Sequence, residues 1–392
     1  MSVTYRDLNP PARLLLGPGP SNADPRVLRA MTTAPIGYFD PDFFQIMDET
    51  KQLLQYTFQT SNPLTLPISG TGTAGMEAAL CNVIEPGDTV AVCVSGFFSD
   101  RMCDIVERCQ GKLIRIEAEW GRIIDPQQVE SVLKQSKVKV VAVVHAETST
   151  GVLQPLGDIS RLAHKYGALL LVDAVTSLGG CPLKVDEWGL DVVYSGSQKC
   201  LSCPPGLAPI TFSARAQAVL DGRRTKVPSF YLDLSLIRRY WGEERVYHHT
   251  PPTNMCYAFR EALRVVQEEG LEARWQRHEL NHRALMAGLQ AMGLEPFAQA
   301  GHWLPSLNVV RVPEGIQDAK VRGRLLQDYG IEIGGGLGKL KGQIWRIGLM
   351  GYNSTRKSVL LFLAALEAVL QAEGYPVRSG AALTAAEQVY RG

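Results

Sequence analysis

One stretch, residues 168 to 206, constrains the fold more than any other part of the chain. Residues 168 to 172 (ALLLV) are an unbroken apolar run, which is typical of a strand buried on both faces of a parallel sheet. Asp173 closes this run, and a second short run at 191–193 leads towards Lys199. In open α/β sheets, ligands bind beyond the carboxyl ends of the strands. We therefore expect Asp173 and Lys199 to face one cavity.

An aspartate and a lysine in one cavity have two interpretations. They can form a structural ion pair, or they can serve pyridoxal phosphate, which needs a lysine for its Schiff base and an aspartate beside its pyridinium nitrogen. The carboxylate keeps that nitrogen protonated, so the ring can take up the electrons left when a substrate Cα–H bond breaks. The position at two strand ends favours the second interpretation.

A glycine-rich turn, SGTGTAG at 69–75, lies between a predicted strand and a predicted helix. Free amides and the positive end of the helix dipole bind anions at such a helix start. The glycines also match the dinucleotide fingerprint, but that fold requires an acidic residue at the end of the next strand. The next strand, at 89–94, is followed by Ser-Gly instead. We therefore predict a single phosphate held by Thr71, Gly72 and Thr73.

Strands and helices alternate along the first half of the chain, which predicts right-handed βαβ units and a doubly wound sheet. The expected fold class is α/β, with a mostly parallel sheet of seven strands. These strands are predicted at 64–68, 89–94, 112–118, 138–146, 168–173, 191–193 and 207–213. Residues 223–252 are rich in aromatic and arginine side chains without a clear period, so we expect an interface loop there.

A chain of 392 residues exceeds the usual size of one hydrophobic core, so we expect two domains. We place an N-terminal arm at 1–13, a large domain at 14–269 and a smaller C-terminal α+β domain at 270–392. The small domain is predicted from two strand patterns and two amphipathic helix patterns. The last residues, from Val377, are expected to be loosely ordered.

Composition narrows the class of protein. An apolar content of 45% with a net charge of +1 is ordinary for a soluble enzyme and gives no basic surface for nucleic acid. No apolar run approaches the roughly 18 residues of a membrane span, and neither end matches a secretory or peroxisomal signal. The eight cysteines lie mostly among apolar residues in a chain too long to need disulfides. We therefore expect a cytoplasmic protein.

Two short motifs suggest other chemistry, and we reject both. HELNH at 278–282 matches the zinc-protease pattern, but no third ligand follows at a useful spacing, so we expect a solvated linker helix and no metal. Cys200 and Cys203 form a CxxC, yet two prolines follow at once where a thioredoxin-like site would begin a helix.

Nine segments occur in the order of a known family. They are LLLGPGPSN, NPLTLPISGTGTAGMEAAL, ETSTGVLQPL, LLLVDAVTSLGG, YSGSQKCLSCPPG, FYLDL, VYHHTPP, GGGLG and WRIGL. Together they resemble the class V pyridoxal-phosphate aminotransferases, over nearly the whole chain apart from the tail. The resemblance implies a fold-type I transferase that moves the amino group of alanine or serine to glyoxylate or pyruvate, giving glycine from glyoxylate.

The resemblance also assigns residues position by position. It makes Lys199 the Schiff-base lysine and proton carrier, and Asp173 the partner of the ring nitrogen. It places Ser149 near the ring hydroxyl and Arg346 on the substrate carboxylate. The remaining implied cofactor contacts are Thr71, Gly72, Thr73, Phe98 and Gln198, with Gly19 near the substrate.

The family pattern further implies a homodimer, because Tyr247 and Thr250 would reach the phosphate of the neighbouring subunit's cofactor. The chain departs from the pattern at two positions. Phe98 stands where relatives carry a tryptophan that stacks on the ring, which keeps an aromatic face but loses an indole N–H. Thr73 stands where close relatives have a histidine. The roles of His248 and His249 are left open.

Three alternatives remain at this point. A cysteine desulfurase or lyase of the same cofactor family would need a mobile nucleophilic cysteine, and Cys203, in a proline-rich turn, is the nearest candidate. A nicotinamide-dependent oxidoreductase would use the glycine-rich turn differently. A non-catalytic protein on this fold would be expected to have lost Lys199 or Asp173, and the chain retains both.

Overall fold

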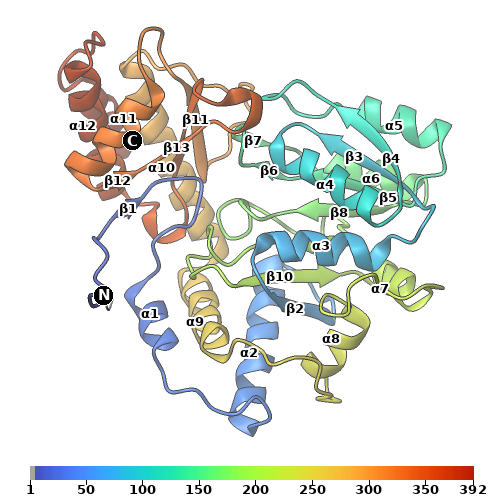
Figure 1. Ribbon diagram of the computed structural model, residues 1–392. Helices are drawn as coiled ribbons and strands as arrows, with labels where there is room; N and C mark the ends of the chain where they lie inside the picture. Colours follow the sequence, from blue (N-terminus) through green and yellow to red (C-terminus); the bar gives the residue numbers. More distant parts are fainter. Residues whose placement is uncertain (1–4) are drawn as a thin grey trace, which may run out of the picture.

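The computed structural model describes residues 5–392, and residues 1–4 of the expected arm lie outside this range. Its largest sheet has seven strands in the order β2-β10-β9-β8-β5-β3-β4, with helices on both sides (Figure 1). All neighbouring strands are parallel except β10, which is antiparallel to β2 and β9. The predicted α/β fold class and the seven strands are confirmed.

The elements of this large unit follow the predicted order. The strands are β2 (Leu64–Ser69), β3 (Thr89–Val94), β4 (Lys112–Glu117), β5 (Val140–Val144), β8 (Leu169–Asp173), β9 (Val192–Tyr194) and β10 (Leu207–Phe212). The helices are α1 (Pro25–Met31), α2 (Pro41–Phe58), α3 (Gly72–Val83), α4 (Phe97–Arg108), α5 (Pro126–Gln135), α6 (Gly157–Lys165), α7 (Ala214–Asp221), α8 (Leu234–Trp241) and α9 (Thr253–Glu269). A short hairpin, β6 (Ala146–Glu147) with β7 (Val152–Leu153), follows β5.

The register of the central strands determines where chemistry can occur. Val144 of β5 pairs with Asp173 of β8, and Asp173 pairs with Tyr194 of β9. Every residue of β5, β8 and β9 is buried, as the unbroken apolar runs predict. The carboxyl ends of three neighbouring strands therefore meet in one row at the edge of the sheet.

A second unit follows the glycine between α9 and α10 (Leu271–Ala291). It has a sheet in the order β11-β14-β13, formed by β11 (Leu307–Arg311), β13 (Gly334–Gly335) and β14 (Ile344–Gly348). Its helices are α10, α11 (Asp318–Tyr329), α12 (Arg356–Ala372) and α13 (Ala381–Arg391). The N-terminal strand β1 (Leu14–Leu15) joins this unit by pairing with β12 (Ile331–Glu332), visible in Figure 1 as a blue segment beside the orange one.

Each unit has its own apolar core, and a third cluster lies between them. This cluster joins Ala146, Cys181 and Cys200 of the first unit to Leu307, Val309 and Ile344 of the second. Leu16 belongs to the apolar core of the second unit, although it precedes the large sheet in the chain. Leu271 and Trp275, at the start of α10, pack into the core of the first unit. The N-terminal segment and α10 therefore connect the two units.

The prediction of a loosely ordered tail is wrong, because residues from Ala381 form helix α13. Ala382 and Ala386 are fully buried, and the Tyr390 hydroxyl donates to Asn281 Oδ1 of α10 at 2.7 Å. Close approach depends on small residues: a Cβ added at Gly288 of α10 would lie 3.1 Å from the Ala382 carbonyl oxygen. The small apolar residues of this segment repeat with a helical period, so its position at the end of the chain was a poor guide to its order.

Two further predictions need correction. The segment expected to be an interface loop contains α8, which Asp233 caps and which buries Ile237, Tyr240 and Trp241. The helix carrying HELNH is solvated on one face only, and His278 and His282 lie on its buried face. His278 Nδ1 bonds the Arg274 carbonyl oxygen at 2.7 Å, and its Nε2 accepts from the Gly351 amide at 2.9 Å. His282 Nδ1 bonds Asn308 Oδ1 at 2.6 Å, so both rings serve the helix packing.

Within residues 5–392, no helix combines the length and the apolar character that crossing a bilayer requires.

The buried face of α13 makes a testable contribution to stability. Replacing Ala386 with Asp places a carboxylate in an apolar contact, which should lower the free energy of unfolding by more than about 2 kcal/mol. Denaturant unfolding followed by circular dichroism measures this change. The matched control is Gln388→Asp, an exposed position on the same helix, which should unfold like the unmodified protein. Equal stability of the two variants would mean that α13 does not pack as described.

Candidate active site

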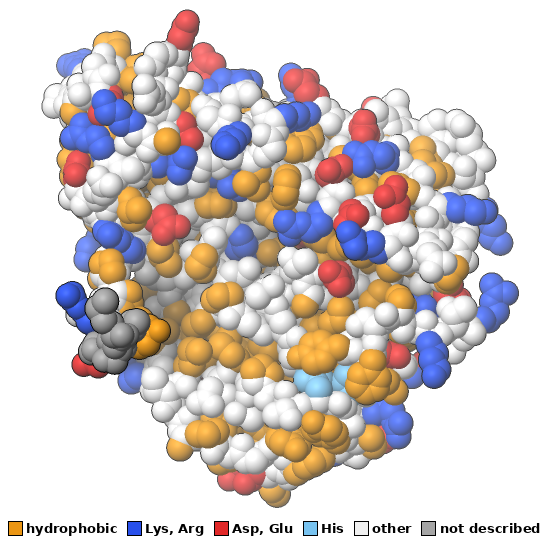
Figure 2. Space-filling view, viewed as in Figure 1, with side chains coloured by type: hydrophobic (Ala, Val, Ile, Leu, Met, Phe, Trp, Pro, Cys, Tyr) orange, Lys and Arg blue, Asp and Glu red, His pale blue; other side chains and the backbone are white. Residues whose placement is uncertain are grey.

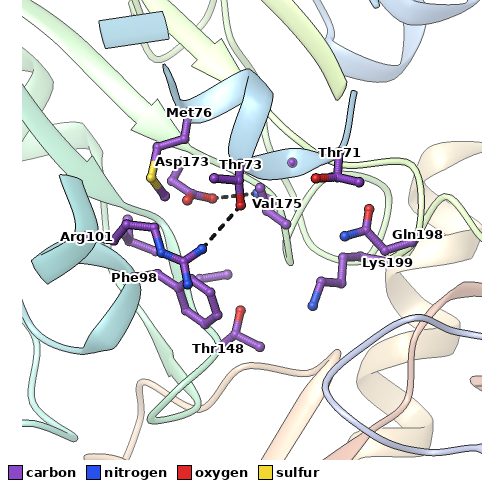
Figure 3. A pocket seen from close by; sticks show the side chains of 13 residues that line it. Thr71, Thr73, Met76, Phe98, Arg101, Thr148, Asp173, Val175, Gln198 and Lys199 are labelled. Atoms are coloured by element: carbon purple, nitrogen blue, oxygen red, sulfur yellow. Dashed lines mark hydrogen bonds between the residues drawn. The ribbon is translucent and has the colours of Figure 1, made fainter. Parts of the chain in front are cut away.

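A cavity lies at the carboxyl ends of the central strands. It opens where the strand order reverses, because β3 has β4 on one side and β5 on the other. Figure 3 shows side chains from the starts of α3 and α4 pointing into it, opposite the residues that follow β5, β8 and β9. The lining residues are Thr71, Gly72, Thr73, Met76, Phe98, Arg101, Val144, Ala146, Thr148, Asp173, Val175, Gln198 and Lys199.

Asp173 ends β8 and is almost completely buried. Its Oδ2 accepts from the Tyr194 hydroxyl at 2.6 Å, and its Oδ1 accepts from the Val175 amide at 2.8 Å. Burial raises the pKa of this carboxyl to about 6, against the lowering effect of the two donors and of Lys199. A cationic group bound beside it would favour the ionised form and lower that pKa again.

Lys199 follows β9 and is only 8% exposed. Burial, and next the positive charge of Arg346, lower the pKa of its ammonium group to about 8. Its Nζ donates to the Pro18 carbonyl oxygen. Gly19 lies against this side chain with a φ of +101°, and a Cβ there would lie 2.5 Å from Nζ, so the position requires glycine. The segment at Pro18 and Gly19 thus closes one side of the cavity over the lysine.

The glycine-rich turn forms the start of α3, with Thr71 at the N-cap. Within the described residues, the amides of Gly72 and Thr73 have no hydrogen-bond acceptor. Gln198 Oε1 is buried without a partner in the same region. A Cβ at Gly72 would lie 3.3 Å from Val175 Cγ2, so glycine keeps this corner open. The arrangement offers donors to an anion, as the sequence predicts.

The walls beside Asp173 are apolar. Phe98 lines one side and Val175 another, with the space between them in Figure 3 bounded by Asp173. Phe98 is the second residue of α4, whose first amides are held by the buried carboxylate of Glu147. Glu147 Oε2 accepts from the Ser99 amide at 3.1 Å, and Oε1 accepts from the Phe98 amide at 3.4 Å. A flat aromatic ligand could be enclosed between these two side chains.

The hydroxyl that faces the cavity after β5 belongs to Thr148, and Ser149 does not line this space. Ser149 is fully buried; its Oγ donates to Glu147 Oε1 at 2.6 Å and accepts from the Phe97 amide at 2.9 Å. The role of Ser149 near the ring hydroxyl therefore stays a prediction, and Thr148 is the neighbouring residue that lines the cavity. Sequence reasoning gave no role to Glu147 or Arg101.

Arg346 lies on β14 and is buried, next to the cavity but outside its lining. Its Nε donates to the Gly335 carbonyl oxygen at 2.7 Å, and its Nη1 donates to the Thr148 carbonyl oxygen at 3.2 Å. Burial lowers the pKa of the guanidinium to about 10, so it is still a cation at neutral pH. The second unit thereby contributes a positive charge at the edge of a site built by the first.

Tyr247 and Thr250 do not reach the cavity of their own chain. Their hydroxyls hydrogen-bond each other at 3.2 Å, and Tyr247 is 49% exposed. Both residues therefore lie on the outer surface of the described chain.

Comparisons with known proteins agree with this geometry. The family model for class V aminotransferases matches residues 14–358. The chain belongs to the class V aminotransferases. It is 44% identical to the (S)-ureidoglycine–glyoxylate transaminase of Bacillus subtilis, over 98% of this chain and 97% of that one. It is 45% identical to the alanine–glyoxylate aminotransferase of Callithrix jacchus, over 93% of this chain and 89% of that one.

Solved structures of the family have the same fold. The alanine–glyoxylate aminotransferase of Nostoc superposes with a TM-score of 0.93 at 49% identity, covering 94% of this chain and 98% of that chain. The ureidoglycine–glyoxylate aminotransferase of Bacillus subtilis gives 0.97 at 46% identity, covering 99% of this chain and all of that one. A cysteine desulfurase from Thermococcus onnurineus gives 0.72 at 18% identity, a likeness of fold alone. The chain is thus a pyridoxal-phosphate aminotransferase.

The residues around the cavity fit this cofactor. The free amides of Gly72 and Thr73 lie at one end of the cavity and can donate to the oxygens of a phosphate. A buried carboxylate, Asp173, and a lysine of lowered pKa, Lys199, line the same cavity, and these are the residue types that a protonated ring nitrogen and an aldehyde would require. Membership of the family and this donor set lead to the same cofactor.

The lowered pKa of Lys199 gives a prediction for the cofactor-free protein. The rate at which a small acylating reagent labels Lys199, followed by mass spectrometry, should rise with a midpoint near pH 8, because only the neutral amine reacts. Arg346→Gln removes a neighbouring positive charge and should move the midpoint to higher pH. Arg356→Gln, a surface residue paired with Glu387, should leave it unchanged. A midpoint near the ordinary value of 10.5 in the unmodified protein would contradict the account.

Proposed function

We propose that this enzyme transfers the amino group of a small L-amino acid, alanine or serine, to glyoxylate or pyruvate, with glycine as the product from glyoxylate. The observation that carries the proposal is the pair Asp173 and Lys199, facing one cavity beside a donor-rich helix start. The glyoxylate acceptor is supported by the names of relatives that are 44–45% identical over nearly the full chain. When bound, pyridoxal phosphate supplies an aldehyde for the substrate amine and a ring that takes up the electrons of the Cα–H bond.

We assign the proton transfer to Lys199. A pKa of about 8 leaves a useful fraction of neutral amine near neutral pH, so Lys199 can remove a proton from the substrate Cα and return it. Asp173 holds the proton on the ring nitrogen, because its buried negative charge stabilises the positive form. Gly19 and Pro18 limit how far the lysine side chain moves.

The other proposed roles are binding roles. Thr71, Gly72, Thr73 and Gln198 hold the phosphate, and Phe98 stacks on the ring. Thr148, and Ser149 through Glu147, orient the loop beside the ring hydroxyl. Arg346 binds the carboxylate that every amino-acid and keto-acid substrate shares, because a planar guanidinium can donate two parallel hydrogen bonds.

A panel of amino donors tests the proposed reaction. L-Alanine, L-serine and (S)-ureidoglycine are each incubated with glyoxylate and the holoenzyme, and glycine is quantified by mass spectrometry. Glycine should form from glyoxylate with alanine or serine as donor, and with serine as donor pyruvate should replace glyoxylate as acceptor and give alanine. If only (S)-ureidoglycine supports glycine formation, alanine and serine are wrongly assigned as donors, and glyoxylate is correctly assigned as the acceptor. If no donor gives glycine, the proposed function is wrong.

Arg346→Lys should affect both half-reactions together. Lysine keeps the charge but cannot form the two parallel bonds, and losing a charge-assisted bond costs about 1.5 to 3 kcal/mol. The KM values for alanine and glyoxylate should therefore rise in parallel by roughly ten- to a hundredfold. The absorbance of bound cofactor should be unchanged. A change for only one of the two substrates would show that Arg346 is not their shared carboxylate ligand.

We further propose that the enzyme is a cytoplasmic homodimer. Large apolar side chains remain exposed around residues 247–249, including Phe39 (51%) and Phe230 (69%), and Tyr247 packs on Phe39 with ring centroids 6.1 Å apart. The lower part of the face in Figure 2 carries a broad group of apolar side chains. Such a patch is typical of an interface, and a second copy is the proposed occupant. The cytoplasm is supported by eight cysteines that are all free and buried.

Mixed dimers test whether Tyr247 and Thr250 act on the neighbouring subunit. One subunit carries Lys199→Ala, and the other carries Tyr247→Ala and Thr250→Ala. As a homodimer, each variant should bind the cofactor weakly or have low transaminase activity. Co-expressed, they should regain activity, because the intact lysine of one subunit meets the intact Tyr247 and Thr250 of the other. No recovery in purified mixed dimers would contradict action across the interface.

A further inference from the structure

Arg101 is a cation in the wall of the cavity, and it has no role in the catalysis and binding proposed for the other lining residues. It is the fifth residue of α4, and its Nη1 donates to Thr73 Oγ1 at 3.2 Å. Its Cζ lies 5.1 Å from the ring centroid of Phe98 and 5.4 Å from that of Phe97. Figure 3 shows this side chain reaching from α4 across the cavity towards the start of α3. The guanidinium is therefore held beside the proposed phosphate-binding turn.

The position of Arg101 is not explained by an ion pair. Within residues 5–392, no carboxylate lies within the 4.0 Å of a salt bridge to Arg101, and its Nε and Nη2 have no hydrogen-bond acceptor. Arg108, on the same helix, is paired with Asp104 at 2.8 Å. A cation in the first turns of a helix is also disfavoured by the helix dipole. Arg101 thus keeps donors free towards the cavity at some electrostatic cost.

The proposed phosphate-binding residues carry no positive charge of their own. Thr71, Gly72, Thr73 and Gln198 offer neutral donors only, and Lys199 is committed to the cofactor aldehyde. A phosphate near neutral pH carries up to two negative charges, and arginine is well suited to bind it because its donors form a planar fork. The hydroxyl of Thr73 accepts from the Arg101 guanidinium, which approaches the start of α3 from the side of Phe98 and Asp173, opposite Thr71 and Gln198 (Figure 3).

We propose that Arg101 binds the phosphate group of pyridoxal phosphate within the same subunit, oriented by the hydroxyl of Thr73. The inference rests on pyridoxal phosphate as the cofactor and is independent of the amino donor and acceptor. It assigns to Arg101 the positive charge that the turn at the start of α3 lacks. The guanidinium carbon of Arg101 lies near the rings of Phe97 and Phe98, and these cation–π contacts limit the entropy lost when the guanidinium is fixed.

The test compares two ligands that differ only in the phosphate. Dissociation constants of pyridoxal phosphate and of pyridoxal are measured by absorbance titration of the cofactor-free protein. In Arg101→Met, which keeps an apolar stem of similar length, the constant for pyridoxal phosphate should rise roughly ten- to a hundredfold, the size expected for one charge-assisted hydrogen bond. The constant for pyridoxal should stay unchanged. Arg108→Met, on the same helix, is the matched control and should alter neither.

Two variants of Thr73 distinguish the orientation of the Arg101 guanidinium from the effect of its positive charge. Thr73→Val removes the hydroxyl and should weaken pyridoxal phosphate binding in the same direction as Arg101→Met, by less. Thr73→Ser retains the hydroxyl and should bind like the unmodified protein. Arg101→Lys retains the charge and should lie between Arg101→Met and the unmodified protein, which also shows that the site still folds.

Three results would overturn the inference. Equal weakening of pyridoxal and pyridoxal phosphate in Arg101→Met would assign Arg101 to packing on Phe98. A raised KM for substrates with unchanged cofactor binding would assign it to the substrate. A change in oligomeric state with unchanged cofactor affinity would assign it to the subunit interface. Failure of the unmodified protein to bind pyridoxal phosphate would instead refute the proposed function itself.

Discussion

The buried carboxylate of Asp173 is the constraint on which the site depends. It lies at the end of β8, in register with Val144 of β5 and Tyr194 of β9, at the edge of the sheet where three strands end together. A charged group in this position is costly unless donors or a cation stabilise it. Tyr194 and the Val175 amide supply two donors, and a pKa raised to about 6 shows that they compensate only in part. A cationic group bound beside Asp173 would complete the compensation, so the site suits a ligand such as a protonated ring nitrogen.

A second buried carboxylate organises the opposite wall. Glu147 accepts hydrogen bonds from the amides of Phe98 and Ser99 at the start of α4 and from the hydroxyls of Ser99 and Ser149. Negative charge at a helix N-terminus is stabilising, and hydrogen bonds to an ionised acceptor are among the stronger ones. Glu147 therefore joins the aromatic wall to the loop that carries Thr148. The hydrogen bonds to Glu147 therefore fix both the aromatic wall and this loop from within the protein.

Much of this could be predicted from the sequence because it is local. An apolar run ending in Asp173, a following strand ending near Lys199, and a glycine-rich helix start each reveal their position along the chain. The parallel arrangement then brings the strand ends together. The seven strands and the family followed from the same segments.

What the sequence did not reveal depends on contacts between distant segments. Arg101 is positioned by a hydrogen bond to Thr73, which lies on another helix. Glu147 is positioned by hydrogen bonds from the first amides of α4. The choice between Thr148 and Ser149 depends on which hydroxyl turns towards the cavity, and neighbouring residues after a strand cannot be distinguished by period alone. Helix α13 shows the same limit, because its alanines are buried only against the small residues of α10.

The central claim is that Lys199 moves the proton of the substrate Cα while Asp173 keeps the ring nitrogen of the cofactor protonated. Exchange of the α-hydrogen of L-alanine with deuterium from solvent, followed by proton NMR without any acceptor, measures this step apart from the rest of the reaction. The account predicts exchange in the holoenzyme, none in Lys199→Ala, and a rate lower by orders of magnitude in cofactor-loaded Asp173→Asn. Exchange at the unmodified rate in Asp173→Asn would contradict it, because the buried carboxylate would then have only a structural role.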